Sequence, residues 1–186
     1  MASNSVNLGI GAATGMFYHA PANTALPDYP TESLGADWTE VGYISDAGIV
    51  WHHGRSAEPL KDWSNSIRRQ LQSDATGTVT APIISTTNEV LATLFGSGNV
   101  TAATATTAHG VLDSVDVHEG VMSGEEAFLF LMKDGDDTLM LGTTKGFITS
   151  LDDVSFEPGS AITWNATVSA DKWKFMKDDG QKVTSP

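Results

Sequence analysis

The sequence predicts a mainly β protein, a β-sandwich or barrel-like fold with one flanking α-helix, extended arms and a long loop. Three observations support this class: several short segments rich in β-branched residues, a single run with helical periodicity, and irregular stretches at both ends. Many short strands with one helix are typical of a sandwich or barrel that carries a helix on its flank. The 186 residues, 40% of them hydrophobic, suit one domain spanning 1–186.

Both ends of the chain lack the periodicity of a packed element. Glycines and prolines punctuate the first forty residues, and these residue types oppose both helix and continuous sheet. Residues 171–186 are charged and polar apart from Trp173, Phe175 and Met176. We therefore expect an N-terminal arm over 1–20 and a C-terminal arm over 171–186, the latter either free or docked elsewhere.

The first strands are expected between residues 41 and 85. Residues 41–44 and 49–52 flank the turn-forming segment 45–48, a pattern that predicts a hairpin. Residues 54–65 are polar and interrupted by Pro59, and they predict a long loop that carries Leu60 and Trp63. Residues 67–85 are rich in Thr and β-branched side chains, which favours another strand.

One short helix is predicted after this region. Thr86 and Glu89 have the spacing of a capping box, and Gly96 occupies a C-cap position. Between them an apolar stripe has helical periodicity, formed by Val90, Leu91, Leu94 and Phe95. A helix this short must be held by packing against a sheet.

More strands follow the helix. Residues 111–117 are one candidate, and 127–132 are apolar on both faces, as expected of a strand covered on both sides. Residues 133–137 predict a turn, from which 138–141 return. Residues 162–168 alternate apolar and polar side chains, the pattern of a half-buried strand.

Composition limits the function classes. Ten Lys and Arg against 23 Asp and Glu give a formal net charge of −13, which disfavours tight binding of nucleic acid. The same acidity suits a surface past which DNA slides, although solubility alone also explains it. Cysteine is absent, which excludes disulfides and thiol chemistry, and no secretory signal or membrane-length apolar run is present. We expect a soluble chain without an export signal of its own.

No chemical motif rises above background. His52 and His53 are adjacent, so on a strand they point to opposite faces. His118 and Glu119 could gather a metal with Asp113 and Asp116, but surface polar residues explain them better. HExxH, GxSxG and a phosphate-binding glycine loop are absent, and paired acids such as 136–137 and 178–179 suit solvated turns. We expect no catalytic, cofactor or metal site, and no enzyme activity.

The five tryptophans divide into two groups. Trp51 and Trp164 lie in strand patterns and are expected in the core, whereas Trp38 and Trp63 lie in loop-like segments. A loop tryptophan can be a sugar-stacking platform, an anchor at a protein interface, or a side chain folded back on its own sheet. The sequence leaves these three interpretations open.

Four segments together resemble the major tail tube proteins of siphophages, particularly those of actinobacterial hosts. They are GMFYHAP with TALP at 15–27, VGYISD with Gly48 at 41–48, TNEVL with LFG at 87–96, and a closing pattern from Phe147 through Glu157-Pro158 to the alternating strand ending at Val168. Each is weak alone, and their order and spacing carry the resemblance.

The resemblance implies a subunit of the virion tail, made in the host bacterial cytoplasm. Six copies would form a ring with a continuous inner β-barrel, and rings would stack into a hollow tube for DNA ejection. Its expected partners are copies of itself and the tape measure, tail tip and tail terminator proteins. DNA would pass without specific binding, and neither a membrane nor a cofactor is involved. The length leaves no room for an added immunoglobulin-like domain.

Two sets of site residues follow from this interpretation. Leu60 and Trp63 are expected to mediate self-assembly, since a large apolar pair in a polar loop suits an interface. No Lys or Arg occurs between residues 70 and 132, and acids from this stretch are expected to line the bore. They are Asp113, Asp116, Glu119, Glu125 and Glu126.

Three other functions remain as alternatives. The nearest is another virion tail or decoration protein. A carbohydrate-binding β-sandwich would use Trp38 and Trp63 as sugar platforms. An acid-dependent hydrolase would need two carboxyl groups across a cleft.

Overall fold

Two halves of an antiparallel sheet share one long strand. The computed structural model describes residues 10–11, 17–108, 110–117 and 124–180, and within them the main sheet has the order β3–β2–β8–β9–β10–β5–β4. In addition, β1 pairs with β8 and β11 pairs with β9. The strands are β1 (Ile10–Gly11), β2 (Phe17–Pro21), β3 (Thr39–Gly42), β4 (Val50–Lys61), β5 (Ile67–Ile83), β8 (Glu126–Asp134), β9 (Asp137–Leu151), β10 (Trp164–Ala170) and β11 (Lys174–Asp178).

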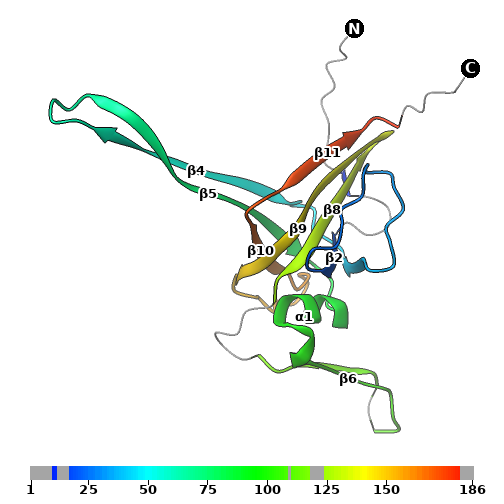
Figure 1. Cartoon of the computed structure of the whole chain (residues 1–186). Helices are drawn as coiled ribbons and strands as arrows, with labels where there is room; N and C mark the ends of the chain where they lie inside the picture. The colour runs from blue at the N-terminus through cyan, green and yellow to red at the C-terminus, as the bar shows by residue number, and fades with distance from the viewer. Residues whose placement is uncertain (1–9, 12–16, 109, 118–123, 181–186) are drawn as a thin grey trace, which may run out of the picture.

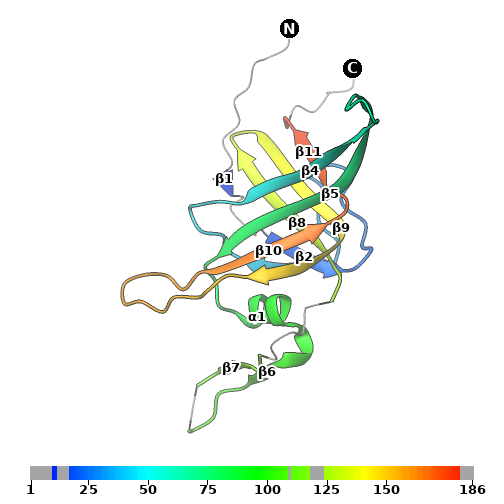
Figure 2. The same ribbon diagram turned by 90° about the vertical axis from the view of Figure 1, so that its left-hand side faces the viewer.

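Strand β9 joins the two halves. Its first part pairs with β8 and β11, and its second part pairs with β10. At the other side, the segment after β3 returns to β5: Ile44 bridges Ile83, and the Ile84 N–H donates to the Tyr43 carbonyl at 2.9 Å. The sheet therefore bends round a core and nearly closes, as Figure 2 shows, which confirms the mainly β class.

Aromatic and β-branched side chains fill the interior. Phe17 stacks on Phe130 with 4.7 Å between ring centroids, and both are buried together with Val79, Ile83 and Val168. In β10 the buried positions alternate with half-buried polar ones, which confirms the predicted alternation from residue 164 onward. Trp51 and Trp164 pack against this core as expected.

Strand β8 is buried on both faces, as its unbroken apolar run predicts. Phe128 and Phe130 face the core, whereas Leu129 lies on the opposite side. That side is covered by the loop between β2 and β3: a Cβ built on Gly142 would lie 2.8 Å from Leu26 Cδ2 and 3.0 Å from Leu129 Cδ1. A glycine is needed in β9 because the loop side chain packs directly on its backbone.

Helix α1 (Asn88–Phe95) is confirmed, but its cap is one residue later than predicted. The Thr87 hydroxyl accepts the Val90 N–H at 3.4 Å, and Gly96 ends the helix with a φ of 89°. Thr86 instead accepts a hydrogen bond from the Trp164 indole at 3.1 Å. Two adjacent threonines offer the same cap chemistry locally, and the contact with Trp164 engages the first of them.

The predicted pairing of residues 41–44 with 49–52 is wrong. A turn does form at 45–48, where the Gly48 N–H donates to the Ser45 carbonyl at 3.0 Å. However, β3 pairs with β2, and β4 pairs with β5. Turn residues fix where the chain bends, but the partner of each strand is set by long-range packing.

The long loop predicted over 54–65 is also wrong for most of its length. Strand β4 continues through Pro59 to Lys61, paired with β5 throughout. Proline lacks an N–H, and it is tolerated in an edge strand whose free side needs no hydrogen bond. Strand β4 is the last strand of the sheet, so Pro59 is accommodated there.

Parts of both expected arms belong to the sheet. Phe17–Pro21 forms β2, with Phe17 buried, although residues 1–20 were expected to form an arm. Within 171–186, Lys174–Asp178 forms β11 on the free side of β9. The remaining residues of 1–20 and 171–186 lie partly outside the described residues.

A small two-stranded sheet lies below α1 in Figure 1. The 3₁₀ turn η1 (Ser97–Asn99) leads into β6 (Val100–Ala103), which pairs with β7 (Leu112–Val115) in a two-stranded sheet. Strand β7 falls inside the segment predicted as a strand, 111–117. No helix in the described part of the chain is long and apolar enough to cross a membrane.

Candidate assembly surfaces

The most prominent surface feature is the hairpin of β4 and β5, which projects far beyond the body (Figure 1). Residues 50–54 pair with 76–80 within the body, and the pairs from Arg55 and Ala75 onward extend away from it. In this part β5 is paired with β4 alone, so within one chain the paired backbone is its main support. This suggests that its distal part is made for contact with another molecule.

An aspartate organises the turn at the hairpin tip. One carboxylate oxygen of Asp62 accepts hydrogen bonds from the Ser64 and Ser66 N–H groups at 2.9 and 3.0 Å, and from the Ser64 hydroxyl at 2.6 Å. The other accepts from Arg68 Nε at 2.6 Å. The Ser64 hydroxyl and the Ser66 N–H lower the pKa of Asp62, with a further contribution from Arg68. The tip is therefore held in one conformation by local bonds.

This ordered turn presents large apolar side chains to solvent. Trp63 is fully exposed, at 105% of its reference area, and Leu60 and Ile67 are more than half exposed. Leu60 and Trp63, which the sequence marks as candidate self-assembly residues, are both exposed in the structure, and Ile67 is exposed as well. Tryptophan is enriched among the residues that dominate binding at protein interfaces. We call these three residues, with the turn 62–66, the hairpin tip.

The hairpin has a slight positive net charge in an acidic chain, because residues 50–83 hold four Lys and Arg against three Asp and Glu. All three arginines of the protein lie in it, at positions 55, 68 and 69, together with Lys61. Lys61, Arg68 and Arg69 are exposed next to the hairpin tip. The hairpin tip thus combines apolar and cationic groups, which suits an acidic partner surface that has its own apolar area.

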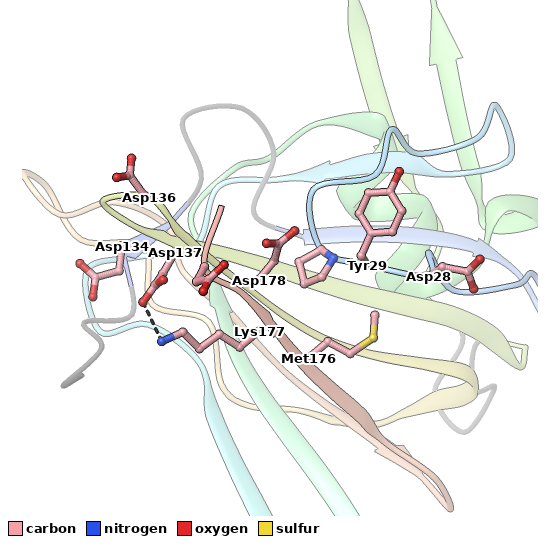
Figure 3. Close-up of a pocket in the computed structure, with 10 residues that line it drawn as sticks. Asp28, Tyr29, Asp134, Asp136, Asp137, Met176, Lys177 and Asp178 are labelled. Carbon is pink, nitrogen blue, oxygen red and sulfur yellow. Dashed lines mark ion pairs between the residues drawn. The ribbon is translucent and has the colours of Figure 1, made fainter. Parts of the chain in front are cut away.

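A hollow at the other side of the body has the opposite charge. It has a volume of about 1220 Å³ and is formed by the loop after β2, the β8–β9 turn and the end of β11 (Figure 3). Six aspartates and one lysine line it, with three residues that supply apolar surface. They are Asp28, Asp134, Asp136, Asp137, Asp178, Asp179, Lys177, Tyr29, Pro30 and Met176.

A hydrogen bond and an ion pair help to hold this hollow, which we call the aspartate hollow, in shape. The Thr31 hydroxyl donates to Asp178 at 2.7 Å and so ties the loop to β11. Lys177 pairs with Asp137 at 2.7 Å across the β11–β9 contact. The sequence did not predict this surface. In the sequence its only signals are the paired acids at 136–137 and 178–179, which predict separate solvated turns.

The described residues among the expected bore acids lie in two separate parts of the fold. Asp113 belongs to β7 and Asp116 follows it, in the small sheet below α1. Glu125 pairs with Lys145 at 3.0 Å, and Glu126 accepts a hydrogen bond from His19 at 3.0 Å, both at the start of β8. Glu119 and His118 lie outside the described residues.

A different face carries no charge. Within the part of the sheet formed by residues 50–54, 76–83 and β10, no Asp, Glu, Lys or Arg occurs. Its outward side carries hydroxyl groups, and those of Thr80 and Thr167 lie 3.2 Å apart. Thr78 and Ser169 occupy paired positions on the same side. We call this surface the hydroxyl face. Its lack of charged side chains contrasts with the net charge of −13 of the whole chain.

Other candidate sites find less support. Trp38 lies in the loop before β3 and lines a hollow of about 360 Å³, whereas Trp63 lies on the hairpin tip, so the two do not form a shared sugar platform. Among the residues that the structure describes, no three His, Asp or Glu side chains gather as a metal site.

Comparisons with known proteins agree with an assembling subunit. A projecting hairpin with exposed apolar residues at its tip suits a subunit that contacts other protein molecules. The model of the family described as phage tail tube protein matches residues 1–179, so the chain belongs to that family. It is therefore a structural protein of the virion tail, it assembles into a tube with other tail components, and it is not an enzyme.

A search of solved structures finds remote similarity. The chain is similar to the tube-terminating cap of the anti-feeding prophage, solved by cryo-EM, with 11% identity and a TM-score of 0.43. The match covers 95% of this chain and 97% of that chain. No curated protein matches this chain in sequence.

Proposed function

We propose that this chain forms homohexameric rings, and that these rings stack into the hollow tail tube through which the phage ejects its DNA. The observation that carries the proposal is the hairpin tip, where an ordered turn holds Trp63 fully in solvent. Covering this side chain with a neighbouring subunit removes its apolar area from water. Leu60 and Ile67 enlarge the same contact.

The open edges of the sheet supply a second means of association. The described strand order ends at β3 on one side and at β4 on the other. An edge strand has unpaired backbone groups that can bond to another strand. We infer that such pairing between neighbours contributes to a continuous inner β-barrel.

For the bore we propose two candidate surfaces. The acids Asp113, Asp116, Glu119, Glu125 and Glu126 would repel DNA phosphates. The hydroxyl face would instead offer DNA no cation to which a phosphate could bind. The separate locations of the described acids favour the hydroxyl face as the main wall. Either surface would let DNA pass without specific binding.

The proposed partners at the two ends of the tube are the tail tip and the tail terminator proteins, and the tape measure protein would occupy the bore before ejection. Head-to-tail stacking leaves different surfaces free at the two ends, so each end would need its own partner.

Analytical ultracentrifugation with negative-stain microscopy tests the proposal. The chain is examined across a wide concentration range, alone and with tail tip components. Rings with sixfold symmetry and tubes of stacked rings are expected. Monomers under every condition would refute it. Rings that never stack would instead indicate another tail component, such as a terminator.

A further inference from the structure

We propose that the hairpin tip of one copy docks in the aspartate hollow of a neighbouring copy. The inference rests on the proposed assembly and goes beyond it, because it names the acceptor surface. The occupant is a second copy of this chain, because the charge and the shape of the two surfaces are complementary.

The donor surface has a definite chemistry. Trp63, Leu60 and Ile67 form its apolar part, and the exposed cations Lys61, Arg68 and Arg69 lie next to these residues in the sequence. Arg68 remains 70% exposed although it is paired with Asp62. A guanidinium group can bind a carboxylate through two parallel hydrogen bonds, one to each carboxylate oxygen. An acceptor for this tip needs carboxylates round an apolar floor.

The aspartate hollow has that composition. Tyr29 is 53% exposed and lies with Met176 among the aspartates, as Figure 3 shows. Aromatic rings and thioethers both pack favourably on an indole. Asp28, Asp136 and Asp179 are exposed residues of its lining and can be reached by the tip's cations. The volume of about 1220 Å³ accommodates a turn with one large aromatic side chain.

The placement of the two surfaces favours contact between copies. In Figure 1 the hairpin leaves one side of the body, and the β8–β9 turn and the loop after β2 lie on the other side. A contact between two different patches of identical subunits is heterologous, and its repetition makes rings or filaments. This is the geometry that a tube requires.

Disulfide trapping tests the contact directly, because the natural chain has no cysteine. Gln70→Cys puts a thiol near the tip and leaves Trp63 and the cations of the tip in place. Met176→Cys puts a thiol in the hollow. The two variants are mixed under assembly conditions and oxidised. A mixed dimer should form at least about tenfold more than with Phe156→Cys, an exposed control outside both surfaces. Tubes without mixed dimers above that control overturn the inference and leave the proposed function standing.

A charge exchange gives a second test that does not depend on disulfide geometry. Arg69→Asp should raise the protein concentration needed for assembly by about tenfold or more, and Asp136→Arg should do the same. Combining both in one chain should restore assembly to within about threefold of the natural protein. Additive losses in the double variant contradict a direct contact. Failure of the natural chain to assemble at all would instead contradict the proposed function.

Discussion

The indole N–H of Trp173 donates a hydrogen bond to the carbonyl oxygen of Gly77 at 2.9 Å, and this contact fastens the start of β11 to the base of the hairpin. A Cβ built on Gly77 would lie only 2.6 Å from Trp173 Cδ1. Gly77 is therefore required by the close approach of an aromatic ring. The contact links the body, the hairpin and the strand that borders the aspartate hollow.

Substituting Gly77 should accordingly destabilise the subunit. Gly77→Ala would displace Trp173, and overpacking of this kind costs about 1–3 kcal/mol. Urea denaturation of the monomer, followed by tryptophan fluorescence, measures the change. Gly98→Ala is the control, because nothing lies within 4 Å of a Cβ at that position. Equal stability of the Gly77 variant and the natural chain would contradict the packing role.

Truncating the tryptophan at the hairpin tip should impair assembly and leave the fold intact. Trp63 makes no packing contribution to its own chain, and anchors of this type contribute about 2 kcal/mol or more to an interface. Trp63→Ala should raise the concentration required for tube formation by about thirtyfold, measured by light scattering and sedimentation. Phe156→Ala removes another exposed aromatic and should have little effect. Tubes of normal length from the Trp63 variant would exclude the anchor role.

The turn at the tip should keep its conformation into mildly acidic solution. The pKa of Asp62 is lowered, first by the Ser64 hydroxyl and next by the Ser66 N–H. A carboxyl group with a lowered folded pKa stabilises the turn above the ordinary aspartate pKa of about 4, and this effect is lost as the pH falls through the folded value. Carbon-13 titration of the Asp62 carboxyl should give a midpoint below about 4. A midpoint at or above the ordinary value would show that the turn is not held by the ionised group.

The two threonines before α1 should differ in their effects. Thr87→Ala removes the N-cap and should cost about 1 kcal/mol of stability. Thr86→Ala removes a partly solvated hydrogen bond to Trp164 and should cost less. Denaturant titration of both variants gives the order directly. A larger loss of stability from Thr86→Ala than from Thr87→Ala would indicate that Thr86 is the N-cap, as the sequence predicts.

Added lysines should identify the surface that faces the DNA. Thr78→Lys on the hydroxyl face would place a ring of cations along the bore, and ejection should become slower and dependent on salt. Asp116→Lys and Glu125→Lys probe the acids predicted from the sequence. Ejection rates of assembled virions are compared at several salt concentrations. Slowing by the acid variants alone would assign the bore to residues 113–126 instead.

The sequence alone determined the features that depend on neighbouring residues. The apolar stripe and Gly96 defined the extent of α1, and the unbroken apolar run predicted that β8 is covered on both faces. The turn at 133–137 and the alternation in β10 were likewise local patterns of side-chain chemistry. The sequence marked Trp63 as an interface candidate, but its exposure became known only from the structure.

Only the tertiary structure decided which strands pair and which side chains meet. Strand pairing depends on packing across the whole sheet, so the pairing of β3 with β2, and of β4 with β5, does not follow from any local pattern. Strand β4 runs through Pro59 because it lies at an edge, and no local pattern reports an edge position. The aspartate hollow draws its acids from residues 28, 134–137 and 178–179. Charge is a property of each residue, but a charged surface exists only where folding brings such residues together.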